Sequence, residues 1–399
     1  MRHHYVVMRR CILAAFAAVL GCGSSGGGTP GAGGSGGAAG GATATGGATG
    51  GASGGTAGGA VGGSADGGAA GTMGGASGGA AGGVAGSGAT GGATAGTGGG
   101  VAGAGGQGAV AKFTVPLFGA AVYGITVGPD RNLWFAASSE IGRVTPAGMI
   151  TEFLLPNSAS QLGAITAGPD GNLWFVQTNM LTSRGSQIGR ATPTGTITMF
   201  NLTTNPGGDM AAGSDGNVWF SVPVDGKISK VTPAAVITHF TIPTPNSAPA
   251  GVTLGPDGNI WFTEAQKIGR VTPDGTITEF PVSGVAARPS DITTGPDGNL
   301  WFTEAANDAK IGRMTPAGTV TEFALPAGNQ LDAITAGPDG NLWFTDTGTK
   351  SVGRITPSGE VTELVVTDSV GKLGGIVAGP DGNLWFTERQ YFQICTIRP

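Results

Sequence analysis

The chain has 399 residues and a net charge of −5, from 20 Lys and Arg against 25 Asp and Glu. The two signs are interspersed and no basic stripe occurs, so the charge pattern argues against nucleic-acid binding. Three cysteines in a chain of this length also exclude a disulfide framework. Most of the 80 glycines are concentrated near the N-terminus, so the chain divides into regions of different character.

Residues 1–22 have the pattern of an export signal. Three arginines precede a short apolar run from Cys11 to Leu20, which is too brief to span a bilayer. The run ends in Val-Leu-Gly before Cys22, which resembles the cleavage site of bacterial lipoproteins, where the cysteine carries the lipid. We therefore expect an exported protein of the cell envelope, in contact with the membrane only through a lipid on Cys22. Release as an ordinary secreted protein is the alternative.

Residues 23–109 form a low-complexity segment of Gly, Ala, Ser and Thr, with Asp66 as its only charge. Such a segment has almost no large apolar side chains to bury, and burial is what offsets the entropy lost on ordering. We interpret it as a disordered, flexible tether, whose reach would be on the order of 50 Å.

A repeat dominates residues 110–399. The string Gly-Pro-Asp-Gly-Asn-Leu-Trp-Phe-Thr-Glu recurs in variants, and all seven tryptophans of the chain fall at one position in it, 40 to 45 residues apart. The repeated tryptophans are Trp134, Trp174, Trp219, Trp261, Trp301, Trp343 and Trp385. A period of this length with one aromatic signature is typical of a propeller, in which each repeat forms one blade.

Each repeat contains four short stretches rich in β-branched and aromatic residues, too short for typical helices. Around Trp301 these are 291–294, 299–303, 310–314 and 319–325. A Gly-Pro-Asp-Gly turn joins the first two and a Thr-Pro-x-Gly turn joins the last two, as expected for hairpins. Four antiparallel strands per repeat predict an all-β, seven-bladed propeller.

The two ends of the repeat region predict how the ring closes. The seventh repeat stops at Pro399, where its second hairpin should begin, and so lacks a fourth strand. Residues 110–116 match the fourth strand at 150–156 position for position. We predict that this N-terminal strand completes the last blade and removes the open sheet edges. The adjacent Trp and Phe of each repeat should pack on opposite neighbouring blades.

Candidate binding residues lie where the loops of a propeller meet around its central channel. Acidic residues follow Trp-Phe-x in four blades, and polar residues stand at the foot of several innermost strands. These residues are Glu264, Glu304, Asp346, Glu388, and Tyr123, Asp209, Ser290, Asp332. The carboxylates could hold Mg²⁺ or Ca²⁺. Alternatively, each pairs with a repeated basic residue of the third strand, at positions Arg143, Arg190, Lys230, Arg270, Arg313 and Arg354.

Histidine and cysteine are too scarce for several kinds of site. Within the repeat region His239 is the only histidine, on an outermost strand, and Cys395 is the only cysteine. A zinc site and a histidine-based triad are therefore excluded. We expect Cys395 to be a buried strand residue.

The repeat Gly-Pro-Asp-Gly-Asn-Leu-Trp-Phe-Thr-Glu with Lys-Ile-Gly-Arg-x-Thr-Pro-x-Gly resembles that of the virginiamycin B lyase, or streptogramin lyase, family over the whole of residues 110–399. The resemblance implies a seven-bladed propeller that opens a cyclic depsipeptide by elimination, a carbon–oxygen lyase reaction using Mg²⁺ and a histidine base. Tyr123 matches the tyrosine of a Pro-Tyr-Gly-Ile motif on the innermost strand of the family's first blade.

The family's active-site motifs are less well matched. Asp332 stands at the position of the first histidine, Gly374 at the base, and Lys372 at a glutamate that binds the metal. The other metal glutamate falls near Glu388 or Arg389. Since glycine cannot accept a proton and Lys372 would repel Mg²⁺, we expect the lyase reaction to be absent.

We therefore expect a monomeric, tethered propeller that binds a small cyclic peptide or another ligand at its rim. The candidate contacts are Tyr123, Asp332 and Glu388, followed by Glu304 and Asp346. Two alternatives remain. One is a lyase of the virginiamycin B lyase type with a relocated base, with Mg²⁺ as the cofactor that the resemblance implies. The other is a structural or protein-binding surface module.

Overall fold

The computed structural model describes residues 94–96, 109–116, 121–156, 161–178, 186–282, 288–305, 309–326, 328–366 and 371–399. The predicted signal sequence, Cys22 and nearly all of the predicted tether lie outside these residues. Among the residues described, no helix has the length and hydropathy needed to cross a membrane.

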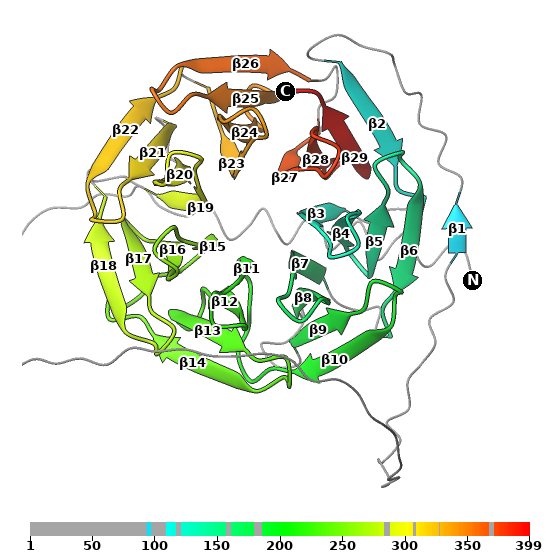
Figure 1. Ribbon diagram of the computed structural model, residues 1–399, viewed down its shortest axis with the longest axis horizontal. Coiled ribbons are helices and arrows are strands. Elements are labelled where there is room, and N and C mark those ends of the chain that lie inside the picture. Colours follow the sequence, from blue (N-terminus) through cyan, green and yellow to red (C-terminus); the bar gives the residue numbers. More distant parts are fainter. Residues whose placement is uncertain are drawn as a thin grey trace, which may run out of the picture. The chain divides into compact units, whose positions relative to one another are not determined.

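Seven antiparallel sheets surround a central channel, each with the first strand of its repeat innermost (Figure 1). This arrangement confirms the predicted all-β, seven-bladed propeller. We number the blades 1 to 7 by their tryptophans in chain order. The innermost strands are β3 (Val122–Val127), β7 (Gln161–Ala167), β11 (Met210–Ala212), β15 (Val252–Leu254), β19 (Pro289–Thr294), β23 (Leu331–Ala336) and β27 (Leu373–Ala378).

The next two strands of each blade carry the repeated motifs. The second strands are β4 (Leu133–Ala137), β8 (Leu173–Thr178), β12 (Val218–Val222), β16 (Ile260–Glu264), β20 (Leu300–Glu304), β24 (Leu342–Asp346) and β28 (Leu384–Glu388). The third strands are β5 (Glu140–Val144), β9 (Gln187–Ala191), β13 (Lys227–Val231), β17 (Lys267–Val271), β21 (Lys310–Met314), β25 (Ser351–Ile355) and β29 (Gln393–Ile397).

The outermost strands form the outer ring of Figure 1. They are β6 (Ile150–Leu154), β10 (Ile197–Asn201), β14 (Ile237–Thr241), β18 (Ile277–Pro281), β22 (Val320–Ala324), β26 (Val361–Val365) and, for blade 7, β2 (Val110–Thr114). Strand β2 pairs with β29 from Val110 opposite Ile397 to Thr114 opposite Gln393. The predicted closure of the last blade is therefore confirmed.

One short strand was not predicted. Strand β1 (Thr94–Gly96) pairs antiparallel with β6, so that blade 1 has five strands. These three residues belong to the segment predicted to be a disordered tether, and their sequence carries no strand signal. Backbone pairing uses only N–H and C=O groups and needs no particular side chain. The sequence pattern therefore could not predict this strand.

The turn aspartate of each repeat explains why its tryptophan can be buried. In all seven blades the indole Nε1 donates to this carboxylate, at 2.9–3.1 Å. The same carboxylate accepts from the asparagine two residues further on, as Asp297 does from Asn299 at 2.8 Å. Trp301 is therefore fully buried without an unpaired N–H group.

The Trp-Phe pair packs on both sides of each blade, as the alternation of strand side chains predicts. Trp301 belongs to a cluster with Leu342 and Phe344 of blade 6. Phe302, the next residue, belongs to a cluster with Trp261 and Ile268 of blade 4. The prediction that these aromatics form the core between neighbouring blades is confirmed.

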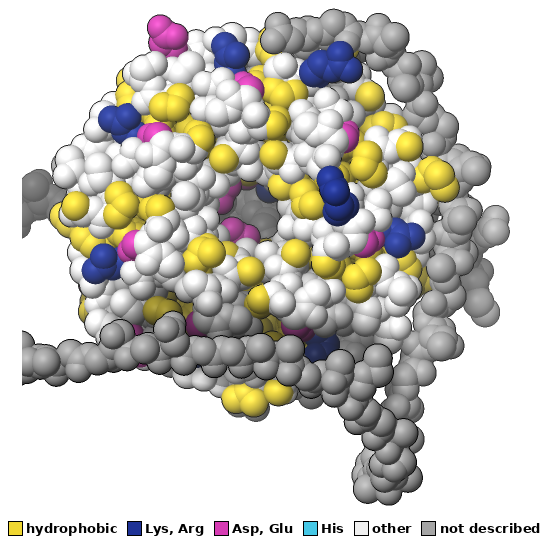
Figure 2. Space-filling model, in the orientation of Figure 1, with side chains coloured by type: hydrophobic (Ala, Val, Ile, Leu, Met, Phe, Trp, Pro, Cys, Tyr) yellow, Lys and Arg dark blue, Asp and Glu magenta, His cyan; other side chains and the backbone are white. Residues whose placement is uncertain are grey.

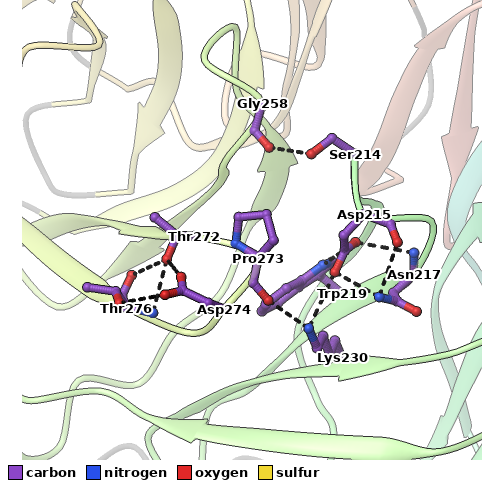
Figure 3. Close-up of polar contacts among 10 residues, drawn as sticks. All are labelled: Ser214, Asp215, Asn217, Trp219, Lys230, Gly258, Thr272, Pro273, Asp274 and Thr276. Carbon is purple, nitrogen blue, oxygen red and sulfur yellow. Dashed lines mark hydrogen bonds and ion pairs between the residues drawn. The ribbon is translucent and has the colours of Figure 1, made fainter.

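Polar contacts also cross the boundary between blades, as Figure 3 illustrates for blades 3 and 4. Lys230 lies 5.1 Å from the centroid of the Trp219 ring and 3.5 Å from the carboxylate of Asp215. Its ammonium group also donates to the carbonyl of Pro273 in the next blade, at 2.7 Å. One repeated cation therefore contacts its own blade and its neighbour.

Candidate functional site

The seven innermost strands enclose a central cavity of about 460 Å³, and Asp and Glu side chains are visible inside its opening (Figure 2). An apolar residue of each innermost strand anchors the wall by packing into its blade. These anchors are Ile125, Ile165, Met210, Val252, Ile292, Ile334 and Ile376. The residues just before each anchor are not repeated, and they give the cavity its chemical character.

In five blades the innermost strand has a β-bulge at this point, for example between Leu331 and Ile334. A bulge leaves residues outside the regular ladder and redirects their side chains. Asp332 is in such a bulge and lines the cavity. Local backbone irregularity therefore positions this predicted site residue.

Two aspartates line the cavity at equivalent positions of blades 3 and 5. Asp209 accepts a hydrogen bond from the Val252 amide at 3.4 Å, and Asp291 accepts one from the Ile334 amide at 2.8 Å. Burial raises the pKa of Asp209 to about 6. Burial, and then the nearby charge of Asp209, raise the pKa of Asp291 to about 8. The cavity therefore holds carboxyl groups that change charge near neutral pH.

A second polar group joins blades 1, 6 and 7. Arg389 Nη2 donates to Asp332 Oδ2 at 2.6 Å, and the guanidinium carbon lies 5.8 Å from the centroid of the Tyr123 ring. All three residues line the cavity. Burial raises the pKa of Asp332 although Arg389 and Lys372 oppose that shift. Burial likewise raises the pKa of Tyr123, against the opposing charge of Arg389.

Arg389 also covers Gly374, the position that matches the base of the virginiamycin B lyase family. A β-carbon added to Gly374 would overlap the Thr387 hydroxyl and lie 3.0 Å from Arg389 Nε. The space that a larger residue would enter is therefore already occupied by side chains of β28 and the loop after it.

The repeated acids after Trp-Phe-x lie elsewhere. Glu264, Glu304, Asp346 and Glu388 are at most 2% exposed and are not among the residues lining the cavity. Each shares a strand face with the phenylalanine two residues before it, and that face packs on the preceding blade. Of the predicted rim residues, the structure thus brings Tyr123 and Asp332 together at the cavity and leaves these four between blades.

These buried acids have acidic neighbours. Burial, and then the neighbouring Glu279, raise the pKa of Glu264 to about 8, and Glu304 beside Glu322 reaches about 7. Blade 1 has its buried acid at the first residue of the third strand, Glu140, which is 1% exposed. Burial, and then the neighbouring Glu152, raise the pKa of Glu140 to about 7. All three glutamates are therefore largely uncharged at pH 6.

The predicted alternative, in which each of these acids pairs with the repeated third-strand cation, is wrong. The repeated cation lies over the aromatic rings and near the turn aspartate instead, as Arg143 does at 3.6 Å from Asp130. The nearer lysine at the start of the third strand pairs with the outermost strand, as Lys310 does with Glu322 at 2.5 Å. Arg270 pairs with Trp261, which is three positions before Glu264 on β16. Residues an odd number of positions apart on a strand point to opposite faces, so the cation and the acid are on opposite faces of the sheet.

The remaining sequence predictions concern single residues. Cys395 is buried in β29, as predicted, and burial raises its pKa to about 12. His239 lies on β14, bonds to Ser229 at 2.7 Å, and does not line the cavity. Among the described residues, no group of three or more His, Cys, Asp or Glu is arranged to hold a metal ion.

Sequence reasoning missed Asp291 and Arg389. Aligning the blades on their innermost apolar anchors would have revealed Asp291, since it then falls at the same position as Asp209. Arg389 was noticed only beside a possible metal ligand. It is the only charged residue at its position in the seven repeats, where the others are Ser138, Thr178, Pro223, Ala265, Ala305 and Thr347.

Fold and cavity together define a seven-bladed propeller with a polar central site. The sequence profile of the Virginiamycin B lyase family matches residues 94–211 and 180–399. The chain therefore belongs to the virginiamycin B lyase family. Among curated proteins, none matches the chain.

Solved structures agree with this assignment. A streptogramin B lyase is 32% identical, with a TM-score of 0.67, over 72% of this chain and 97% of that one. A catalytically inactive virginiamycin B lyase from Staphylococcus aureus with quinupristin is 32% identical, with a TM-score of 0.67, over 73% and 99% of the two chains. Hydrazine synthase from Kuenenia stuttgartiensis, 14% identical with a TM-score of 0.57, shares the fold alone, over 71% and 97% of the two chains.

Proposed function

We propose that this protein is a ligand-binding member of its family that lacks the lyase reaction. Its central cavity would hold a small cyclic peptide or a ligand of similar size, with Tyr123, Asp332 and Arg389 as contacts. The observation that carries the proposal is the position of Arg389. With the Thr387 hydroxyl, its side chain crowds the space next to Gly374, where the family resemblance calls for a histidine base.

The chemistry of elimination supports the same conclusion. A base must remove the proton next to the ester carbonyl, and a histidine suits that role because it titrates near neutral pH. No histidine lines the described cavity. Arg389 and Lys372 are cations that would repel Mg²⁺, and Asp332 is already paired with Arg389. These residues do not fit the metal that the family resemblance implies.

Incubation of the purified chain with quinupristin tests this proposal. We expect an increased melting temperature, because a ligand that binds only the folded protein stabilises it, and no change in the ligand's retention on chromatography, with or without Mg²⁺. The Staphylococcus aureus enzyme is the positive control for turnover. Elimination adds no water, so retention and the absorbance of the new double bond are the readouts rather than mass. Mg²⁺-dependent opening of the ring would contradict the proposal.

A lyase with a relocated base is the second candidate, and Asp209 and Asp291 are the observation in its favour. Both line the cavity, and the pKa of about 6 for Asp209 would leave it ionised at neutral pH. If quinupristin is opened, Asp209→Asn should abolish turnover under this alternative. Binding of neither ligand nor metal would instead favour the third alternative, a protein-binding surface module.

We also propose that the propeller is exported and held at the cell envelope by a lipid on Cys22. The support is the sequence pattern before Cys22 and the low-complexity segment that follows it. Metabolic labelling with a palmitate analogue should mark the full chain and not its Cys22→Ser variant. Equal labelling of both would contradict the lipid anchor.

A further inference from the structure

The guanidinium group of Arg389 lines the central cavity, at a place that we call the channel mouth. It is held in place, and some of its N–H groups have no acceptor. Arg389 bonds to Asp332 through Nη2 at 2.6 Å and lies over the ring of Tyr123. Its Nε is buried without an acceptor, and Nη1 donates to no described residue. The Arg389 side chain is nevertheless 35% exposed, so a ligand in the cavity can reach it.

Three neighbours restrict the movement of this side chain. The Arg389 amide donates to the Lys372 carbonyl at 2.8 Å, which ties the loop after β28 to the start of β27. The absence of a side chain on Gly374 leaves the space in which the stem of Arg389 lies. Asp332 fixes the direction of the guanidinium. A donor group held by its own protein loses little entropy when a ligand binds.

The two cations at this point of the cavity favour an anionic partner. There, Arg389 and the exposed Lys372 provide two positive charges, and Asp332 provides one negative charge. Asp209 and Asp291 also line the cavity, and burial raises the pKa of both. A planar guanidinium matches a carboxylate in geometry, and the bond between them is stronger than one between neutral groups. Apolar side chains, among them Ile125, Ile334 and Ile376, also line the cavity.

We propose that the mouth of the channel is a carboxylate receptor, in which Arg389 binds the free acid of a linear peptide whose apolar side chain enters the cavity. This inference rests on the proposed function as a ligand-binding propeller and names the class of ligand. A cyclic ester has no such acid, so the site would prefer an opened peptide to a closed one.

Two small molecules that differ only in the acid test this inference. N-acetyl-phenylalanine and N-acetyl-phenylalaninamide would be titrated into the full-length protein at pH 7 and followed by NMR. We expect the acid to bind at least ten times more tightly than the amide. Equal affinity, or binding of neither molecule, would overturn the carboxylate receptor. Quinupristin binding without turnover would then still support the proposed function, so the two failures can be told apart.

Variants identify the group responsible. Arg389→Gln should remove the preference for the acid, whereas Arg398→Gln, at an exposed arginine of the same blade that does not line the cavity, should keep it. Asp332→Asn should strengthen acid binding several-fold, because it removes a competing negative charge while its amide oxygen can still accept a hydrogen bond from Arg389. A preference that survives Arg389→Gln would contradict the proposal. So would an Asp332→Asn variant that loses as much affinity as Arg389→Gln.

Discussion

The contacts between blades are the same around the ring, whereas the residues at the wall of the central channel vary, although the same repeats form both. Between blades, one arrangement recurs: all seven tryptophans bond to their turn aspartate. At the channel, the residues two positions before the apolar anchors share no common side chain: three are glycine and the other four are of four different types. They are Tyr123, Gly163, Gly208, Ala250, Ser290, Asp332 and Gly374.

The difference follows from what surrounds each position. A buried side chain between blades is enclosed on all sides, so a change in its volume is costly. A side chain that lines the channel, such as that of Ser290, is not enclosed on all sides, so a change in it disturbs the packing less. The repeat is therefore kept where blades touch and has diverged where ligands can reach. Within one family, the framework can be retained while the site changes.

The largest test of this comparison is a substitution between blades. Trp301→Ala should reduce the free energy of unfolding by about 3–5 kcal/mol, because it opens a cavity between two blades. Ser290→Ala, at the channel wall of the same blade, should change it by less than about 0.5 kcal/mol. Denaturant unfolding of both variants measures the contrast. Similar losses in the two would show that the channel is as constrained as the boundary between blades.

Removal of a turn aspartate should have a smaller effect. Asp297→Ala removes the acceptor of the Trp301 N–H and of Asn299 while leaving the rings in place. We expect a loss of about 2–3 kcal/mol, since a buried donor is left unpaired. Asp274→Ala, in an exposed turn of blade 4, is the control and should have little effect. A melting temperature for Asp297→Ala equal to that of the control would refute this role.

Replacement of a buried acid between blades should increase the free energy of unfolding, whereas the two substitutions above should reduce it. The pKa of Glu140 rises from 4.5 to about 7 on folding, so its contribution to stability is complete below pH 4.5 and is lost as the pH rises to about 7. Glu140→Gln should therefore have little effect at pH 5 and stabilise the protein by about 2 kcal/mol at pH 8. Melting curves at the two pH values provide the measurement. A constant difference between variant and parent would mean that Glu140 does not titrate in this range.

The smallest effect concerns the one blade whose second hairpin lacks glycine. Ala235 has a φ of 62°, in a turn where the equivalent glycines have φ of 85–97°. A β-carbon on those glycines would overlap the outer phenylalanine of the preceding blade. The phenylalanine in this place for Ala235 is Phe200, and the distance between the Trp174 and Phe200 ring centroids is 6.1 Å, against 5.3–5.5 Å in the other pairs. Ala235→Gly should raise stability by about 0.5 kcal/mol, despite the greater freedom of the unfolded chain. A lower melting temperature would contradict this account.

The architecture was predictable because repetition makes weak signals add up. One hairpin motif indicates little, but seven at one spacing predicted the blade number, and residues 110–116 predicted the closure between β2 and β29. The burial of Trp and Phe on opposite sides followed from strand alternation. These features depend on neighbours in sequence and on a fixed period, so the sequence by itself determined them.

The site depended on contacts that no period describes. Arg389 lies next to Gly374, pairs with Asp332 and is close to Tyr123. These contacts form because three blades meet at one point, and they join residues up to 266 positions apart in sequence. The burial of Glu264 and Glu304 between blades likewise depended on the strand face, which a one-residue change reverses. Only the tertiary structure decided these features, because the ring brings together side chains whose distances the sequence does not encode.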